Sequence, residues 1–145
     1  MNDFELHSHL INQKGSRLEL NTPVLVVDLD ALDRNIAAMA AFAAENGLNL
    51  RPHAKTHKSQ DIAKRQMTAG AIGQCCSKLG EAEALEMAGV SRGLHITSPV
   101  TSAPAIARLA CLNVRTEGMM CVVDNPANAA AIATAARSIG KPVSV

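Results

Sequence analysis

The stretch from Arg51 to Ser59, which reads RPHAKTHKS, gathers the ionisable side chains that could do chemistry. It continues an apolar run, so we predict that it begins as the end of a β-strand. Because side chains alternate between the two faces of a strand, Arg51, His53 and Lys55 share one face and the apolar side chains share the other. Ionisable groups on a buried face are costly unless a charge pairs with them. This face is therefore predicted to bind an anionic cofactor.

Lys55 is the better candidate nucleophile of the two lysines in this stretch. It is predicted to end the strand, whereas Lys58 begins the solvent-facing turn before the next helix. Desolvation of a lysine beside a second cation such as Arg51 favours the free amine, which can attack an aldehyde. An exposed basic loop is the alternative interpretation, and composition and periodicity weigh the two equally.

The histidines do not form a convincing metal site. His53 and His57 have the spacing of a helical ligand pair, but they straddle the predicted strand end. We expect His53 instead to stack on a cofactor ring or to form a hydrogen bond with it. His7 and His9 lie in a polar leader and are expected to face solvent, whereas His95 could face either side of its strand.

The cysteines are predicted to be free thiols. No C-x-x-C pair occurs among the four, and the adjacent Cys75 and Cys76 would point to opposite faces of a strand. Mostly buried, unpaired thiols are the usual state of such cysteines.

Short apolar or β-branched runs alternate with helical runs, and Gly or Pro marks each junction. The strands are predicted to start roughly 20 to 25 residues apart, which is the spacing of βα units. The predicted strands are Val24–Asp28, Leu48–His53, Ala71–Cys76, Gly93–Thr97, Gly118–Val123 and Pro142–Val145.

Capping residues indicate where the helices between these strands begin and end. Asp30, Ser59, Ser102 and Asn125 are predicted to begin four helices, and a fifth is predicted from about Leu79 to Ala88. Glycines are predicted to end four of these five helices, at Gly47, Gly70, Gly89 and Gly140.

Repeated βα units predict an α/β fold with a parallel sheet and right-handed crossovers. An open doubly wound sheet and a (β/α)8 barrel both fit, and no G-x-G-x-x-G follows any predicted strand. A barrel needs eight units and about 250 residues. We therefore expect an incomplete TIM-type barrel of about five to six βα units, in a truncated chain that stops inside an apolar run.

The composition excludes several classes of protein. The 145 residues carry a net charge of +1, and both Trp and Tyr are absent. These features give no basis for binding nucleic acid or an anionic membrane surface. No apolar run approaches the ~20 residues that span a bilayer, and the first residues lack a secretory signal, so we predict a cytoplasmic protein.

Three blocks resemble a known family and occur in that family's order. They are TPVLVVDLDALDRNI (Thr22–Ile36), RPHAKTHKS (Arg51–Ser59) and IGQCCSKLGEAEAL (Ile72–Leu85). They are similar to the N-terminal halves of D-threonine aldolases and D-serine dehydratases, which belong with alanine racemase among the barrel-type pyridoxal-phosphate enzymes. The second block is the most specific, and its first lysine, Lys55 here, forms the Schiff base in that family.

The resemblance implies a lyase for D-β-hydroxy amino acids that uses pyridoxal 5'-phosphate. A D-threonine aldolase, which releases glycine and an aldehyde, is the first expectation; a D-serine dehydratase (an ammonia-lyase) or an amino-acid racemase is the alternative. Lys55 would be catalytic, and Arg51 and His53 would join it in binding the cofactor. A non-catalytic pyridoxal-phosphate-binding protein and an inactive fragment are further alternatives.

The resemblance also implies parts that this chain does not carry. A C-terminal β-domain would hold a divalent metal, with ligands outside this chain, and the parent protein would be a homodimer.

We divide the chain into a polar leader, 1–21, and the N-terminal part of the cofactor-binding barrel, 22–145. The expected partner is a small D-amino acid, with no nucleic acid or membrane, and these residues alone are expected to lack turnover.

Overall fold

The computed structural model describes residues 2–145, which divide into two compact units at Leu32 and Asp33. The first unit contains α1 (Asp3–His7), two short 3-10 helices, η1 (Ser8–Leu10) and η2 (Ser16–Glu19), and the beginning of α2 (Leu29–Glu45). A capping box begins α1, because the backbone N–H of Glu5 donates to Asn2 Oδ1 over 2.9 Å. The predicted polar leader therefore contains helical turns.

The prediction of a strand at Val24–Asp28 is wrong. This segment has no regular secondary structure, its side chains are exposed, and Leu25 retains 98% of its accessible surface. A strand needs a ladder of backbone hydrogen bonds, and within the described chain residues 22–27 form none. The helix cap predicted at Asp30 is also displaced, because Asp28 Oδ1 accepts the backbone N–H of Ala31 over 2.9 Å.

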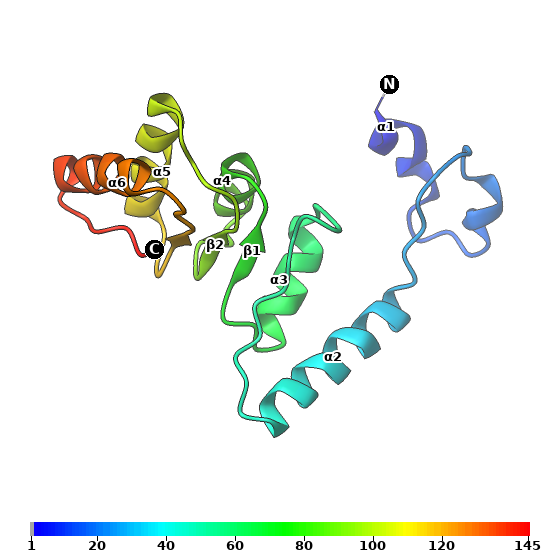
Figure 1. The fold of residues 1–145 in the computed structure, drawn as a ribbon. Coiled ribbons are helices and arrows are strands. Elements are labelled where there is room, and N and C mark those ends of the chain that lie inside the picture. The colour runs from blue at the N-terminus through cyan, green and yellow to red at the C-terminus, as the bar shows by residue number, and fades with distance from the viewer. Residues whose placement is uncertain (1) are drawn as a thin grey trace. The chain divides into compact units, whose positions relative to one another are not determined.

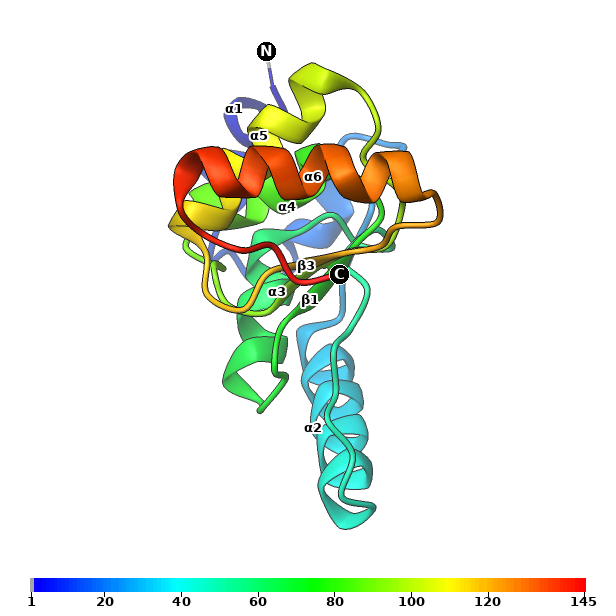
Figure 2. The same ribbon diagram turned by 60° about the vertical axis from the view of Figure 1, so that its left-hand side comes forward.

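The second unit is built on a parallel sheet, as the βα pattern predicted. Its strands β1 (Gln74–Cys76), β2 (Leu94–Ile96) and β3 (Met120–Cys121) pair in the order in which they follow one another along the chain (β1 and β2 are labelled in Figure 1, β3 in Figure 2). Each strand lies inside one of the predicted runs but is shorter than predicted.

Isolated bridges extend this sheet on both sides. His53 pairs with Cys75 on one side, and Ser144 pairs with Met120 on the other, both in parallel. The strand predicted at Leu48–His53 is irregular because Pro52 has no N–H to donate. Its pairing also slips by one residue: Leu50 O accepts from Ile72 N–H, but Pro52 O accepts from Cys75 N–H.

Four helices follow the strand segments in the second unit: α3 (Gln60–Thr68), α4 (Leu79–Met87), α5 (Ala103–Arg115) and α6 (Pro126–Ile139). Two predicted caps are confirmed. Ser59 Oγ accepts the backbone N–H of Ile62 over 3.3 Å, and Asn125 Oδ1 accepts that of Ala127 over 2.8 Å. Ser102 precedes α5 as predicted, but its side chain makes no capping hydrogen bond.

One face of the sheet packs against helices and forms the core. In Figure 2, α6 runs across this region in front of α4 and α5. Buried side chains from the strands, including Cys76, Leu94 and Ile96, cluster with buried helix residues such as Leu109 and Ile132. None of the described helices is long and apolar enough to cross a membrane.

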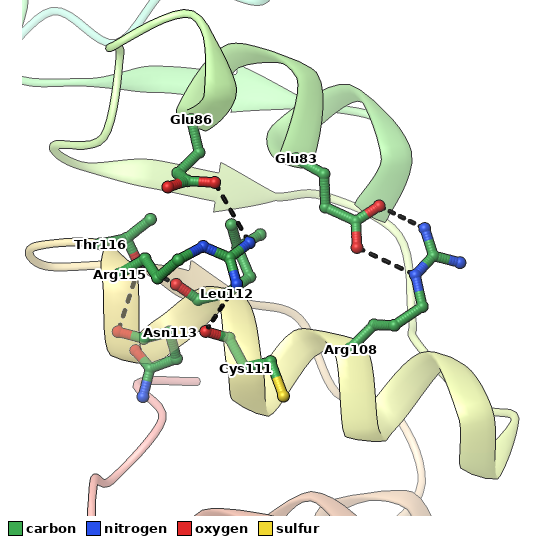
Figure 3. A network of polar contacts seen from close by, with 8 residues as sticks. All are labelled: Glu83, Glu86, Arg108, Cys111, Leu112, Asn113, Arg115 and Thr116. Carbon is green, nitrogen blue, oxygen red and sulfur yellow. Dashed lines mark hydrogen bonds and ion pairs between the residues drawn. The ribbon is translucent and has the colours of Figure 1, made fainter.

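Two ion pairs join α4 to α5 beside this core (Figure 3). Arg108 binds both carboxylate oxygens of Glu83, with 2.9 Å between Nε and Oε1. Further along both helices, Arg115 Nη2 lies 3.1 Å from Oε2 of Glu86. Because these arginines are about half exposed, the pairs contribute little to the stability of the fold.

A candidate active site on the open face of the sheet

The face of the sheet opposite the core carries a row of residues in register, which we call the open-face row. The sheet pairings align its five members side by side: His53, Cys75, His95, Met120 and Ser144. Cys75 and His95 are partly exposed, whereas the strand neighbours of each that point toward the helices are buried. The prediction that Cys75 and Cys76 point to opposite faces is confirmed, and His95 lies on the open face.

Arg51 lies on this open face with an unsatisfied donor. Its Nε is buried and has no hydrogen-bond partner among the described residues. Its charge acts on the open-face row. Burial raises the pKa of the Cys75 thiol, which Arg51 partly offsets. Burial also lowers the pKa of His95, and the Arg51 charge and the neighbouring His53 imidazole act in the same direction. A cation with a free, buried N–H is suited to an anionic ligand.

His53 is held by hydrogen bonds at both ring nitrogens. Its Nε2 lies 3.3 Å from Oγ1 of Thr97, which directly follows β2. Its Nδ1 accepts the backbone N–H of Lys55 over 3.3 Å. The Thr97 hydroxyl in turn donates to the Cys76 carbonyl oxygen over 3.0 Å. These contacts connect the backbone of the candidate nucleophile to the centre of the sheet.

Lys55 lies just beyond the sheet, in a turn, and not at the strand end where we predicted it. The turn is closed by the backbone N–H of Lys58, which donates to the carbonyl oxygen of Ala54 over 2.8 Å. The Ala54 side chain is 4% exposed and anchors the turn, while the Lys55 side chain is exposed. The predicted desolvation of Lys55 is therefore not found, and its amine is accessible from solvent.

Lys58 and His57 occupy the connection between this turn and α3. Lys58 is exposed and adopts a left-handed conformation with φ of 50°. His57 Nδ1 accepts the backbone N–H of Ser59 over 3.0 Å, and burial lowers the pKa of His57. Lys58 thus serves the junction with the helix, as predicted, and not the open face.

His7 and His9, which were expected to face solvent, lie in the first unit. In the first unit, His7 Nε2 accepts the backbone N–H of Asn21 over 3.1 Å, so this side chain is partly buried and does not simply face solvent as we expected. His9 is exposed. Among the described residues, no group of three or more His, Cys, Asp or Glu side chains is placed to hold a metal ion.

Sequence reasoning missed Cys75, His95 and Thr97 as site residues. Their faces could have been assigned from the alternation of LHI and QCC, because Leu94, Ile96 and Cys76 are apolar residues suited to the core. The contact between His53 and Thr97 could not have been found in this way, since it depends on the register of segments 44 residues apart.

Comparison with known proteins places this site in context. The sequence profile described as the alanine racemase N-terminal domain matches residues 27–145. The chain is 38% identical over 128 residues to a 3-hydroxy-D-aspartate aldolase of Paracoccus denitrificans, an alignment that covers 88% of this chain and 33% of the relative. It is 41% identical over 130 residues to a D-threo-3-hydroxyaspartate dehydratase of Delftia sp., with the same two shares covered.

A solved structure of a related enzyme is also similar to this chain. The crystal structure of D-threonine aldolase from Filomicrobium marinum superposes with a TM-score of 0.83 at 38% identity, covering 86% of this chain and 33% of that one. The chain thus spans about a third of the length of the relatives it matches.

Proposed function

Since the chain belongs to the family of the alanine racemase N-terminal domain, we propose that it is the cofactor-binding part of a pyridoxal-phosphate-dependent lyase for D-β-hydroxy amino acids. The observation that carries the proposal is the arrangement on the open face, where Arg51 and His53 lead to the turn that bears Lys55. Two aldolases and a dehydratase, all named for D-configured hydroxy amino acids, are similar to this chain.

The sheet order supports an arc of a (β/α)8 barrel over a doubly wound sheet. The pairing runs from His53 through β1, β2 and β3 to Ser144 without reversing direction. Doubly wound sheets reverse their strand order at a switch point, whereas a barrel adds each strand beside the previous one. In a barrel the open face is the interior, and Lys55 follows the carboxyl end of its segment, where barrel enzymes place their active sites.

The residues present fit an anionic aldehyde cofactor. The Arg51 Nε has no partner among the described residues and can donate to an anionic group, and the exposed Lys55 amine can attach to an aldehyde carbon. Because both nitrogens of His53 are already engaged, its ring faces remain for stacking on a cofactor ring, so stacking is favoured over a hydrogen bond.

Bound pyridoxal phosphate would supply an electron sink for the bond that breaks at the substrate Cα. The protein residues around the cofactor determine which bond to the substrate Cα breaks. In an aldolase, the Cα–Cβ bond breaks and the substrate hydroxyl loses its proton. In a dehydratase, the Lys55 amine takes the Cα proton and hydroxide leaves from Cβ. We propose the aldolase outcome first. A divalent metal, if the whole protein holds one, would supply Lewis-acid chemistry, and its ligands would lie outside the described residues.

The products distinguish the two outcomes in an assay of the whole protein. D-threonine cleaved by an aldolase gives glycine and acetaldehyde, whereas a dehydratase gives ammonia and a 2-oxo acid. We expect glycine and aldehyde, lost on chelation and restored by added divalent metal. Ammonia release would favour the dehydratase, and interconversion of D and L forms alone would favour a racemase and contradict the lyase proposal.

Matched lysine variants test the role of the turn. We expect Lys55→Ala to lower turnover by at least about a thousandfold, because it removes the attachment point. Lys58→Ala, which removes a neighbouring exposed amine of the same kind, should change turnover only a few fold. Equal losses in the two variants would contradict the assignment of Lys55.

A further inference from the structure

The hydrogen bonds around His53 have a direction that is set at both ends by backbone groups. At one end, the Lys55 amide is only a donor, so the Nδ1 atom that it contacts must carry a lone pair. At the other end, the Cys76 carbonyl oxygen is only an acceptor, so the Thr97 hydroxyl must donate its single hydrogen to that oxygen. Thr97 Oγ1 can then only accept at its contact with His53 Nε2.

We infer that Thr97 is a positioning residue that holds His53 as the neutral tautomer protonated at Nε2. In this tautomer the His53 Nε2–H donates to Thr97 Oγ1, and the unprotonated Nδ1 accepts the Lys55 amide N–H. The opposite tautomer would set an Nδ1–H against the Lys55 N–H and leave the two donors facing each other. Thr97 thereby fixes the turn that presents Lys55, without touching Lys55 itself.

The strand geometry shows why Thr97 can do this. The backbone N–H of Thr97 also donates to the Cys76 carbonyl oxygen, over 2.8 Å, so the ladder between β1 and β2 fixes the base of the side chain. The hydroxyl therefore reaches across β1 to His53 from a position fixed by the ladder, whereas Lys55 and Thr56 in the turn that follows His53 are exposed. The sheet therefore fixes the position of Thr97, and Thr97 in turn positions His53 and the turn after it.

Its importance for catalysis rests on the proposed function, but the arrangement itself can be measured without a cofactor. The protein is labelled with 15N in histidine, and the two ring nitrogens of His53 are identified by the signals lost in a His53→Gln variant. We expect Nε2 to carry the directly bonded hydrogen and Nδ1 to show the chemical shift of an unprotonated ring nitrogen. A wild-type spectrum with hydrogen on Nδ1 would overturn the inference.

Two substitutions at Thr97 separate the hydroxyl from the shape of the side chain. Thr97→Val keeps the branched shape and the backbone N–H but removes the hydroxyl, so we expect a mixture of His53 tautomers. The Lys55 amide should then exchange its hydrogen on the order of fivefold faster, as the loss of one neutral hydrogen bond predicts. Thr97→Ser, which keeps the hydroxyl, should retain the wild-type tautomer and exchange rate. A single Nε2–H tautomer in Thr97→Val would contradict the role of Thr97.

A second readout keeps this inference separate from the proposed function. Incubation with pyridoxal phosphate followed by reduction tests whether Lys55 binds the cofactor at all. An Nε2–H tautomer that depends on Thr97, without an adduct on Lys55, would uphold the positioning role and refute the cofactor proposal. An adduct on Lys55 together with a tautomer that is unaffected by Thr97→Val would support the cofactor proposal and refute the positioning role of Thr97.

Discussion

Gly73 allows β1 and β2 to approach closely enough to align the open-face row, and adding one methyl group there should be costly. A Cβ built on Gly73 would lie 1.9 Å from the carbonyl oxygen of Gly93 and 2.7 Å from its Cα. Ordinary van der Waals contact begins at 3.4 Å, so the methyl group would intrude by about 1.5 Å. Because the obstacles are backbone atoms, no side-chain rotation can relieve the overlap.

The cost of Gly73→Ala follows from this geometry. Overpacking costs about 1–3 kcal/mol even where side chains can shift, and here the two strands must separate. Separation would also weaken neighbouring backbone hydrogen bonds, each worth about 0.5–1.5 kcal/mol. We therefore expect Gly73→Ala to lower the free energy of unfolding by about 3–5 kcal/mol, or to prevent folding.

Gly80 provides the matched control. It lies in α4, and a Cβ there would meet nothing within 4 Å. Gly80→Ala should raise the free energy of unfolding by about 0.5–1 kcal/mol, since alanine is favoured over glycine in helices. Urea denaturation of both variants and the wild type gives the comparison. A Gly73→Ala protein as stable as the wild type would refute the close approach of the two strands.

Three further predictions concern the helix cap, the thiols and the titration of histidines. Asn125→Ala should lower the free energy of unfolding by about 1 kcal/mol, because two backbone N–H groups at the start of α6 lose their acceptor; urea denaturation measures this loss. A thiol reagent should modify the exposed Cys111 quickly and spare the buried Cys76, whose pKa is raised to about 12 mainly by burial; labelling of Cys76 in the folded protein would contradict this. Burial lowers the pKa of both His57 and His95 from the ordinary 6.5, so the unfolded chain binds protons first as the pH falls. The free energy of unfolding should therefore decline below about pH 6.5 and be fully present above it; a rise on acidification through this range would contradict the assignment.

The elements that could be predicted from sequence are those specified by local interactions. Ser59 and Asn125 cap their helices within three residues of their own position, and their side chains suffice to satisfy the local N–H groups. The runs that contain β1, β2 and β3 were predicted from their short apolar stretches, whose buried residues join the helices in one core.

The elements that could not be predicted depend on partners. The residues at Val24–Asp28 have the β-branched composition of a strand, but composition provides no hydrogen-bonding neighbour. The segment that ends at His53 was predicted as regular, whereas Pro52 limits it to an isolated bridge. This irregularity moves Lys55 from the strand into the turn.

The geometry of the candidate site was predicted only in part, and its chemistry stays a prediction. Alternation placed Arg51 and His53 on one face, and the register of the sheet confirms His53 on the open face beside Cys75. The hydrogen bond to Thr97 required a register between strands that no local pattern encodes. The role of Lys55 stays a prediction, supported by its position and by the family.

Covalent mapping of the cofactor tests the central claim most directly. The whole protein is incubated with pyridoxal phosphate, reduced with borohydride and digested, and the modified peptide is identified by mass spectrometry. We predict a single pyridoxyl adduct on Lys55, retained in Lys58→Ala and lost in Lys55→Arg. An adduct on another lysine, or none, would contradict the claim that the turn after His53 holds the cofactor.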